Sequence, residues 1–370
     1  MSNILIIFEV KDNTTDNNLL ALTTVLSRMA LTYRSIKTSC VESADLYWCD
    51  VIIAIRPSSI YSSEIIRAAK EACRFVIISL DDDILNLPFN NPNYWKRKYA
   101  INCLELGDVL MSTSQLMLDD YCEKYHLRPL HVNAFVEAET IKGLHHIGNK
   151  IRIVYPAGKD HIGLFNKYIL PFFDNLISTY SDRIDITFIG VEPNITPSNS
   201  VHFVKGMSYE DYLSFMSSHD YDIGIAPLED NPFCARKYFA KYIEYSRFGI
   251  LGIYSAVKPY TYVVKDGYNG FLVQGGEDKW EETLIKVIEN SLKYAEIVSN
   301  SQKDLINRFS LEAAINNLKD YCLELENYKG NDSCFPKLTY GSMKCLSYEI
   351  RNIYYKIINR INYRISNLLC

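Results

Sequence analysis

The sequence lacks the features that mark several common protein classes. Its 370 residues hold no C-x-x-C pair and no group of cysteines and histidines at zinc-ligand spacing, which argues against a zinc domain. No G-x-G-x-x-G fingerprint follows an apolar run, so a nicotinamide or flavin enzyme is not expected. The 39 basic and 44 acidic residues nearly balance, and the net charge of −5 gives no electrostatic reason to expect a nucleic-acid partner.

Long hydrophobic runs are missing as well. The N-terminal run from Ile4 to Phe8 is followed by Glu9 and Lys11, so it is too short for a signal peptide or a membrane span and suits a buried strand. The ten cysteines are scattered along the chain, and we interpret them as reduced, mostly buried thiols. These features predict a cytoplasmic protein.

What the sequence does contain is a repeated alternation of strand-like and helix-like segments. A chain of this length, with 48% apolar and 13% aromatic residues, can bury two cores. The first part shows apolar runs at 4–8, 51–55, 75–80 and 108–112, with helical periodicity at 62–73 and 94–106. The pattern restarts with strand candidates at 151–155, 184–189, 201–204, 223–226, 250–254 and 271–273. Helical stretches at 164–180, 209–218 and 311–328 accompany this second series.

Two such series predict two Rossmann-like α/β domains that face each other across a cleft. We expect an N-terminal domain over 1–145 and a C-terminal domain over 150–328, with the boundary near 138–150. Ligands of parallel sheets bind outside the carboxyl ends of the strands, so the loops at those ends are where function is expected.

The C-terminal segment 337–370 differs in character from the rest. It carries six basic residues against one acid, Glu349. Apolar residues recur there at steps of three and four, which predicts a basic amphipathic helix. Such a helix packs on the domains or on a partner chain, or it lies on an anionic membrane surface, and the sequence leaves both open.

The segment 222–273 carries the most chemical information. A strand ends at Ala226, a polar loop follows, and a helix is predicted to begin near Ala235. Lys237, Lys241 and Glu244 then share one helical face. A helix N-terminus with added lysines suits a diphosphate, because free N–H groups and positive side chains both favour the anion. A carboxylate one turn later suits the two hydroxyls of a ribose.

This segment resembles the donor-binding region of retaining GT-B glycosyltransferases of family four, in the branch described as glycosyltransferase family 1-like. That branch has a P-L-x-x-N-P-F loop, a helix with K-x-x-x-K-x-x-E-Y, and then D-G-x-x-G-x-L-V; this chain matches them at 227–233, 237–245 and 266–273. Weaker similarities lie at 155–162, at 78–88 and at 108–114. The resemblance covers about residues 50–325 and is specific only over 222–273.

The resemblance implies roles for individual residues. Lys237 and Lys241 would neutralise the leaving diphosphate, helped by Lys159, while Glu244 would hold the ribose. The acidic run at 81–83 fits either an acceptor contact in the N-terminal domain, in which Asp82 would bind the acceptor hydroxyl and serve as a base, or a simple helix cap. The substrate-binding set implied for the nucleotide sugar is Glu244, Gly158, Lys159, Asp230, Asn231, Phe233 and Tyr245. The family mechanism is retaining and needs neither a metal ion nor a cofactor.

Two departures keep other functions open. Relatives carry a first glutamate eight residues before the second, whereas this chain has Arg236 there, with Glu229 or Asp230 as substitutes. The G-I-P-like turn of the family is also altered and reads Gly249-Ile-Leu-Gly252 in this chain. Both changes admit a non-catalytic pseudo-glycosyltransferase that acts as a partner or scaffold. The acidic run at 81–83 also admits a metal-dependent GT-A transferase in which Asp81 and Asp83 hold a divalent cation.

The favoured hypothesis is transfer of a sugar from a nucleoside-diphosphate sugar to a glycan, lipid-linked glycan or protein acceptor. A cytosolic enzyme with a basic amphipathic tail suits synthesis of a surface polysaccharide or glycan. We therefore expect a cytoplasmic protein, with contact to the inner face of the cell membrane through 337–370.

Overall fold

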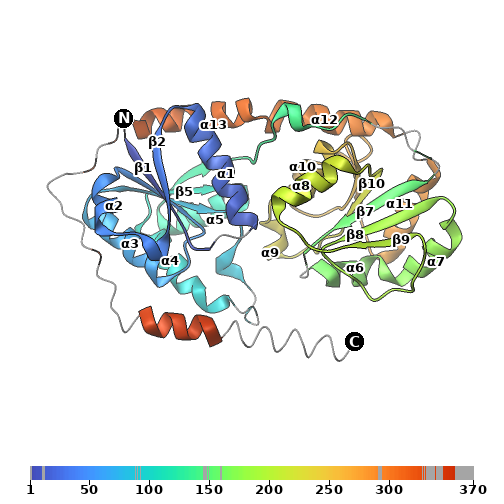
Figure 1. Cartoon of the computed structure of the whole chain (residues 1–370), viewed down its shortest axis with the longest axis horizontal. Helices are drawn as coiled ribbons and strands as arrows, with labels where there is room; N and C mark the ends of the chain where they lie inside the picture. The colour runs from blue at the N-terminus through green and yellow to red at the C-terminus, as the bar shows by residue number, and fades with distance from the viewer. Residues whose placement is uncertain are drawn as a thin grey trace. The chain divides into compact units, whose positions relative to one another are not determined.

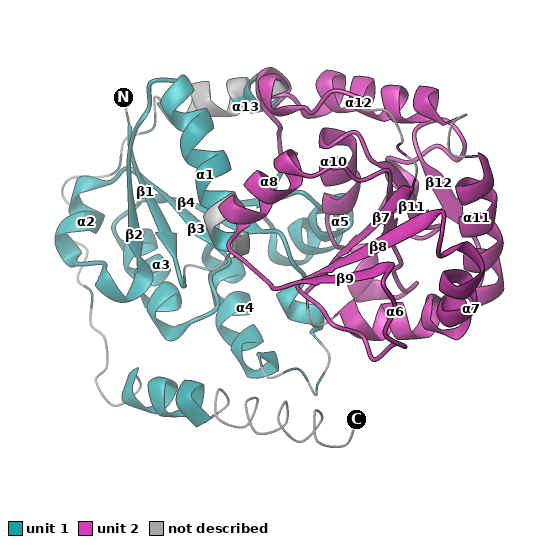
Figure 2. Ribbon diagram, turned by 45° about the vertical axis from the view of Figure 1, so that its right-hand side comes forward, with its two compact units in different colours: residues 1–133, 315–370 teal, residues 134–314 magenta. Residues whose placement is uncertain are grey.

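The chain folds into two compact α/β units in a computed structural model (Figure 1). Unit 1 comprises residues 1–133 and 315–370, and unit 2 comprises residues 134–314 (Figure 2). Unit 2 begins at Ala134, whereas the sequence predicted a boundary near 138–150. Within unit 2 the backbone N–H of Val136 donates to the carbonyl of Phe309 at 2.7 Å. The structure describes residues 2–10, 13–87, 89, 91, 93–144, 148, 150–158, 161–290, 294–326, 328, 330, 338 and 345–354.

Unit 1 is built on a six-stranded parallel sheet. Its strands stand in the order β2-β1-β3-β4-β5-β6. The four strands between the edges are nearly all apolar, because a parallel sheet is covered on both faces. The strands are β1 (Asn3–Phe8), β2 (Thr32–Lys37), β3 (Val51–Ile55), β4 (Phe75–Leu80), β5 (Val109–Ser112) and β6 (Arg128–His131).

Helices cover both faces of this sheet. The helix α3 shows why a helix begins where it does: Ser59 and Ser62 form a reciprocal capping box at its start, and Ile65, Ile66 and Ala69 face the core. The helices are α1 (Asn13–Arg28), α2 (Ser43–Trp48), α3 (Ile60–Glu71), α4 (Arg97–Leu106) and α5 (Gln115–Tyr125), with α13 (Leu311–Glu326) returning from unit 2.

Unit 2 is built on a second six-stranded parallel sheet, and all six expected strands are present. Their order is β12-β11-β10-β7-β8-β9. The expected helix over 164–180 is two helices instead, because the chain breaks at Ile169 just before Leu170-Pro171 opens α7. The strands are β7 (Ile151–Pro156), β8 (Ile184–Ile189), β9 (Val201–Val204), β10 (Ile223–Ala226), β11 (Leu251–Ser255) and β12 (Phe271–Val273). The helices are α6 (Ile162–Tyr168), α7 (Leu170–Tyr180), α8 (Tyr209–Ser218), α9 (Pro232–Ala235), α10 (Ala240–Arg247), α11 (Glu277–Asn290) and α12 (Ala295–Phe309).

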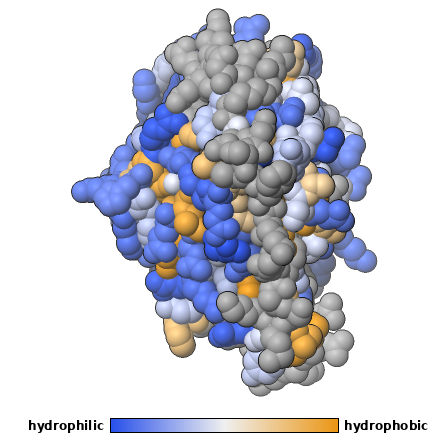
Figure 3. Space-filling view, turned by 90° about the vertical axis from the view of Figure 1, so that its left-hand side faces the viewer, coloured by the Kyte–Doolittle hydropathy of each residue, from blue (hydrophilic) through white to orange (hydrophobic). Residues whose placement is uncertain are grey.

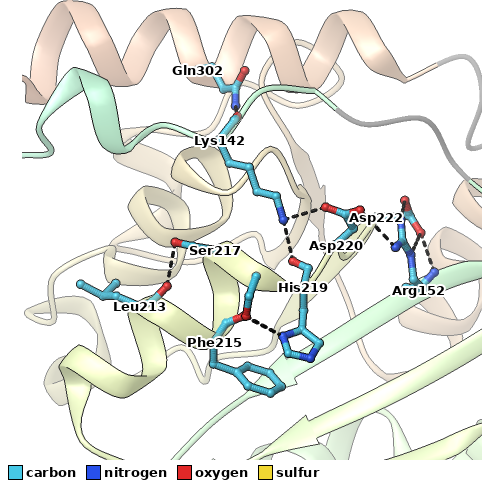
Figure 4. A network of polar contacts seen from close by, with 10 residues as sticks. Lys142, Arg152, Leu213, Phe215, Ser217, His219, Asp220, Asp222 and Gln302 are labelled. Atoms are coloured by element: carbon cyan, nitrogen blue, oxygen red, sulfur yellow. Dashed lines mark hydrogen bonds and ion pairs between the residues drawn. The ribbon is translucent and has the colours of Figure 1, made fainter.

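A polar network closes the amino-terminal edge of the unit 2 sheet (Figure 4). Asp222, just before β10, accepts hydrogen bonds from the backbone N–H and the guanidinium of Arg152 in β7. Lys142 forms an ion pair with Asp220 at 2.6 Å, and its carbonyl accepts from the Gln302 side chain at 2.7 Å. These contacts join β7, the segment before β10, the loop at Lys142 and α12, so the network stabilises the amino-terminal edge of unit 2.

None of the helices in the described parts of the chain is both long enough and apolar enough to cross a bilayer.

Candidate functional site

The strand order of unit 2 places the candidate site. The chain lays down β7, β8 and β9 on one side and β10, β11 and β12 on the other, so the order reverses between β7 and β10. Ligands of such sheets bind outside the carboxyl ends of the strands at this switch point. The loops that leave β7 and β10 there are residues 157–161 and 227–239. They contain most of the residues expected from the sequence.

The loop after β10 is shaped by Asn231. Its side-chain oxygen accepts a hydrogen bond from the backbone N–H of Cys234 at 2.8 Å and thereby caps the short helix α9. Phe233 follows on α9 and is half-buried, while Asp230 is exposed. Asn231 therefore already has a structural role, whereas the side chain of Asp230 lies open to solvent.

The expected helix near Ala235 begins later. Residues 236–239 separate α9 from α10, which starts at Ala240. Lys237 therefore lies in the connection before the helix, and Lys241 lies in its first turn. This corrects the prediction that both lysines share one helical face with Glu244. The two lysines still flank the start of α10, where backbone N–H groups point outward.

The most closely connected part of the site is a cluster around Glu244. The Glu244 carboxylate accepts a hydrogen bond from the Lys241 ammonium at 2.6 Å and one from the Tyr212 hydroxyl at 3.0 Å. The Glu244 side chain is 13% exposed and that of Lys241 is 26% exposed. Burial, and next the Glu244 carboxylate, raise the pKa of Tyr212 well above its ordinary value, so the phenol remains a donor.

The sequence identified Lys241 and Glu244 but gave no signal for Tyr212. This tyrosine lies on α8, 32 residues away from Glu244, and only folding brings the two together.

Lys237 reaches the other loop of the switch point. Its ammonium nitrogen lies 3.5 Å from Nε2 of His161, which follows β7, and 5.2 Å from the centre of the Phe233 ring. A cation over an aromatic face is held in place without losing its charge. The structure thus brings Lys237, Phe233 and His161 together, at the place where the sequence predicted lysines beside a phosphate.

The turn after β7 is the second expected contact. Gly158 is exposed, and its carbonyl accepts from the backbone N–H of His161 at 2.9 Å. Gly190 follows β8 and has a φ of +84°. A Cβ at this position would lie only 2.6 Å from the carbonyl oxygen of Ala157. The turn after β7 therefore packs against the backbone of Gly190, where a larger residue would not fit. Lys159 lies outside the described residues.

Tyr245 requires a correction. Its side chain has no exposed surface, and its hydroxyl donates to the carbonyl of Ile225 at 2.9 Å. The ring lies against Gly224, where a Cβ would stand 2.6 Å from it. Tyr245 is thus part of the core beneath the site and holds α10 on β10, rather than contacting a substrate.

Arg236 stands where relatives carry the first glutamate, and the two acidic residues that could replace that glutamate, Glu229 and Asp230, have different surroundings. Glu229 forms an ion pair with Lys167 at 2.8 Å, and both side chains are well exposed. Arg236 turns back on its own loop and donates to the carbonyl of Pro232 at 2.9 Å. Asp230 remains the exposed carboxylate nearest in sequence to the site lysines.

Unit 1 presents an acidic counterpart at its own switch point. Its strand order reverses between β1 and β3, and Glu9 and Arg56 follow these strands. Glu9 accepts from the Ser58 backbone N–H at 3.0 Å. Arg56 has φ +50°, which a side chain of this size rarely adopts, and pairs with Asp81 at 3.1 Å and Asp82 at 2.8 Å. The sequence identified Asp82, whose side chain is more exposed than that of Asp81, at 41% against 16%, but missed Arg56 and Glu9.

The proposal of a GT-A metal site is wrong, because the fold is not GT-A. Two six-stranded parallel sheets in separate units are the GT-B arrangement. Asp83 is 1% exposed and caps a short 3-10 helix, where it also accepts from the Tyr121 hydroxyl and the Asn86 amide. Burial raises the pKa of Asp81 above its ordinary value, with the Arg56 charge opposing this shift.

Comparisons with solved structures agree with this fold. The chain resembles HepE from Anabaena in complex with UDP-glucose, with a TM-score of 0.63 and 14% identity over 88% of this chain and 100% of that chain. It resembles sucrose-phosphate synthase from Thermosynechococcus elongatus with a TM-score of 0.63 and 10% identity, over 88% and 99%. A glycosyltransferase from Rickettsia africae gives a TM-score of 0.58 and 15% identity, over 88% and 99%.

No protein-family model and no curated protein sequence matches this chain. At these identities the structural comparisons establish the GT-B fold, and a fold alone does not determine a reaction.

Proposed function

We propose that this protein is a retaining, metal-independent glycosyltransferase that moves a sugar from a nucleoside-diphosphate sugar to an acceptor hydroxyl. Unit 2 binds the donor, and the Glu244 carboxylate accepts hydrogen bonds from the ribose hydroxyls. Solved structures that resemble this chain include HepE with UDP-glucose, which supports a nucleotide sugar as the donor class.

The observation that carries the proposal is the cluster of Lys241, Glu244 and Tyr212 at the start of α10. Lys241 and Tyr212 both donate to one oxygen of Glu244, Oε2. The second oxygen, Oε1, is therefore the natural acceptor for a ribose hydroxyl. A carboxylate held by two donors loses little freedom when a ligand binds.

The two lysines supply the catalytic electrostatics. Negative charge develops on the diphosphate as the bond to the sugar breaks, and fixed cations beside a helix N-terminus stabilise that charge. Lys237 and Lys241 flank the start of α10, so both suit this role. Departing phosphate and incoming hydroxyl lie on one face of the sugar in this mechanism, and the hydroxyl proton passes to the leaving phosphate oxygen. Asp82 of unit 1, whose side chain is 41% exposed, contacts the acceptor hydroxyl in this proposal but takes no proton from it, which replaces the base role expected from the sequence.

The acceptor class follows from the same proposal. We place the reaction in the synthesis of a surface polysaccharide or glycan, with a glycan, a lipid-linked glycan or a protein as the acceptor. Free thiols such as buried Cys49 and Cys103 agree with a cytoplasmic setting.

A second candidate is a non-catalytic partner protein that retains nucleotide binding. Arg236 favours it, because this residue stands where relatives carry a glutamate and its guanidinium is turned to the Pro232 carbonyl. The two candidates differ in turnover, so binding and activity have to be measured separately.

The deciding experiment is calorimetric titration of UDP, GDP, ADP and CMP, with and without EDTA, followed by a turnover assay with the matching nucleotide sugar. We expect one nucleoside diphosphate to bind independently of EDTA. Glu244→Gln should weaken that binding about tenfold or more, because a charged acceptor is lost.

A matched control is available in unit 2. Lys279 and Glu282 form an ion pair on α11 with the same spacing and a distance of 2.7 Å, so Glu282→Gln should leave binding unchanged. If a nucleotide binds but no sugar donor is converted to free nucleoside diphosphate, the non-catalytic partner is favoured. Failure of every nucleotide to bind would reject both candidates.

A further inference from the structure

Charged side chains are common on this protein, and hydrophilic residues make up much of the described surface on the face in Figure 3. An exposed cation therefore indicates little by itself. Lys167 of α6, for example, is paired with Glu229 at 2.8 Å. The site lysine Lys241 is paired with Glu244 at 2.6 Å. Both cations are neutralised within the protein.

Lys237 has a different neighbour. Among the carboxylates that the structure describes, none forms an ion pair with it. Its ammonium nitrogen instead lies 3.5 Å from Nε2 of His161, and the Phe233 ring lies on another side at 5.2 Å. Neither neighbour carries a negative charge, so the charge of Lys237 is left for an anion that comes from outside the chain.

The backbone of His161 is held on both sides of the residue. Its N–H donates to the Gly158 carbonyl at 2.9 Å, and its carbonyl accepts from the Tyr155 hydroxyl at 2.9 Å. Tyr155 lies on β7 and is 2% exposed, so the support is part of the core. Because both bonds use the backbone of His161, a substitution of the imidazole leaves them in place.

The contact with Lys237 determines the protonation state of the imidazole before a donor binds. An ammonium group has three donors and no acceptor, so Nε2 must be the acceptor and carries no proton. A positive charge on the ring would also be opposed by the Lys237 charge at 3.5 Å. His161 is therefore neutral in the ligand-free protein.

The elements around His161 carry other titratable and charged groups. They are Tyr155 on β7, Lys167 on α6, and Glu229, Asp230, Cys234, Arg236 and Lys237 on the segment after β10, while Lys159 and Asp160 lie outside the described residues. Burial raises the pKa of the Cys234 thiol above its ordinary value, so the thiol stays neutral. Arg236 donates to the Pro232 carbonyl, and Glu229 is already paired. Lys237 is thus the cation in contact with the imidazole.

We propose that His161 is a further contact of the leaving diphosphate and takes up a proton from solvent when the donor binds. This inference rests on the proposed function, which brings the diphosphate beside Lys237. A phosphate oxygen between the two nitrogens accepts a hydrogen bond from each of them only if Nε2 carries a proton. The bound anion supplies the attraction that favours the charged ring. The imidazolium then adds a positive charge where negative charge develops as the sugar leaves.

Titration calorimetry measures the proton uptake directly, with UDP-glucose, GDP-mannose and ADP-glucose as the probes. Both phosphates of a sugar nucleotide are diesters, so they lack the ionisation at about pH 6 that a phosphate monoester contributes. The binding enthalpy is measured in PIPES, HEPES and Tris at about pH 7, where a histidine ordinarily titrates. Its slope against the ionisation enthalpy of the buffer gives the number of protons taken up.

We expect one probe to bind with uptake of roughly half a proton or more, because the free ring is neutral and the bound ring is charged. Since a proton is then a reactant, the affinity should fall about threefold or more as the pH rises from about 6.5 to about 8.5.

Two variants test the assignment to His161. His161→Gln keeps a side-chain N–H donor but cannot take a proton, so it should abolish both the uptake and the pH dependence. A purely structural role would instead weaken binding by the same factor at every pH. Lys237→Met removes the repulsion, so the ring is protonated in advance and the uptake should fall by about half or more.

The matched control is His202→Gln in unit 2. His202 lies on the edge strand β9, 3.9 Å from Asp185, and its loss should leave the uptake unchanged. Thermal melting without ligand checks that each variant is folded.

The outcomes separate this inference from the donor site on which it rests. A probe that binds without proton uptake, or with uptake that His161→Gln retains, would overturn the role of His161 and leave the donor site intact. If none of the three probes binds, the donor site itself is rejected and the role of His161 is rejected with it.

Discussion

The carboxyl edges of the two sheets have the same construction and opposite chemistry. In unit 2 the switch point gathers Lys237 and Lys241 around the start of a helix, with one carboxylate between two donors. In unit 1 it gathers carboxylates around a single arginine, Arg56. The comparison teaches that the parallel sheet provides only the place, whereas the loop residues determine which charges are presented there.

The cores behind these edges differ too. Two core clusters of unit 1 are dominated by isoleucine, leucine, valine and alanine, and a small third cluster joins Ile60, Trp95 and Tyr348. The cluster behind the unit 2 site is rich in tyrosine and phenylalanine, and glycines make room for the rings. Gly252 lies under Tyr254, where a Cβ would stand 1.9 Å from the hydroxyl oxygen. The altered turn at 249–252 is thus part of an aromatic packing arrangement.

The largest expected effect concerns the cations that distinguish the two edges. Lys237→Ala combined with Lys241→Ala should lower kcat by about two to three orders of magnitude, because the leaving diphosphate loses its fixed positive charges. The measurement is the initial rate at saturating donor. Lys279→Ala, an exposed lysine on α11, is the control and should leave the rate unchanged. A double variant with wild-type kcat would show that the cationic edge does not take part in transfer.

The next effect tests the aromatic core. Gly252→Ala should destabilise unit 2 by about 3 kcal/mol, because Tyr254 is 1% exposed and its ring has no space into which to move. Gly107→Ala in unit 1 should cost about 1 kcal/mol, since the overlap is smaller there: the nearest atoms are Cγ1 of Ile78 at 2.9 Å and Cδ2 of Leu127 at 3.1 Å. Scanning calorimetry compares the two variants, and equal losses would remove the distinction between the cores.

The smallest effect concerns one hydroxyl in each unit. Tyr212→Phe removes a donor to Glu244 and should weaken nucleotide binding by about 1 kcal/mol, with less effect on folding. Tyr121→Phe removes the equivalent donor to Asp83 in unit 1 and should lower stability without affecting nucleotide binding. Titration calorimetry and thermal melting of both variants give the two readouts. The reverse pattern would place nucleotide binding in unit 1.

Much of the fold followed from hydrophobic pattern. All six strands of unit 2 were predicted, and α8 has the predicted bounds Tyr209–Ser218. The strands β2 and β6 were missed because they are edge strands with polar, exposed residues, so no apolar run marks them. The later start of α10 was missed because α9 interrupts the chain before it, and local periodicity does not reveal a break of four residues.

The sequence by itself determined the α/β class, the repetition of the pattern and the residue types available for an anion site, because burial and helix periodicity are written into neighbouring residues. Only the tertiary structure decided which of those residues meet. Tyr212 reaches Glu244 across 32 residues, His161 reaches Lys237 across 76, and Tyr245 turns into the core instead of toward a ligand. The order of the strands in the sheet creates these contacts. That order depends on how the whole chain packs, and the local hydrophobic pattern does not encode it.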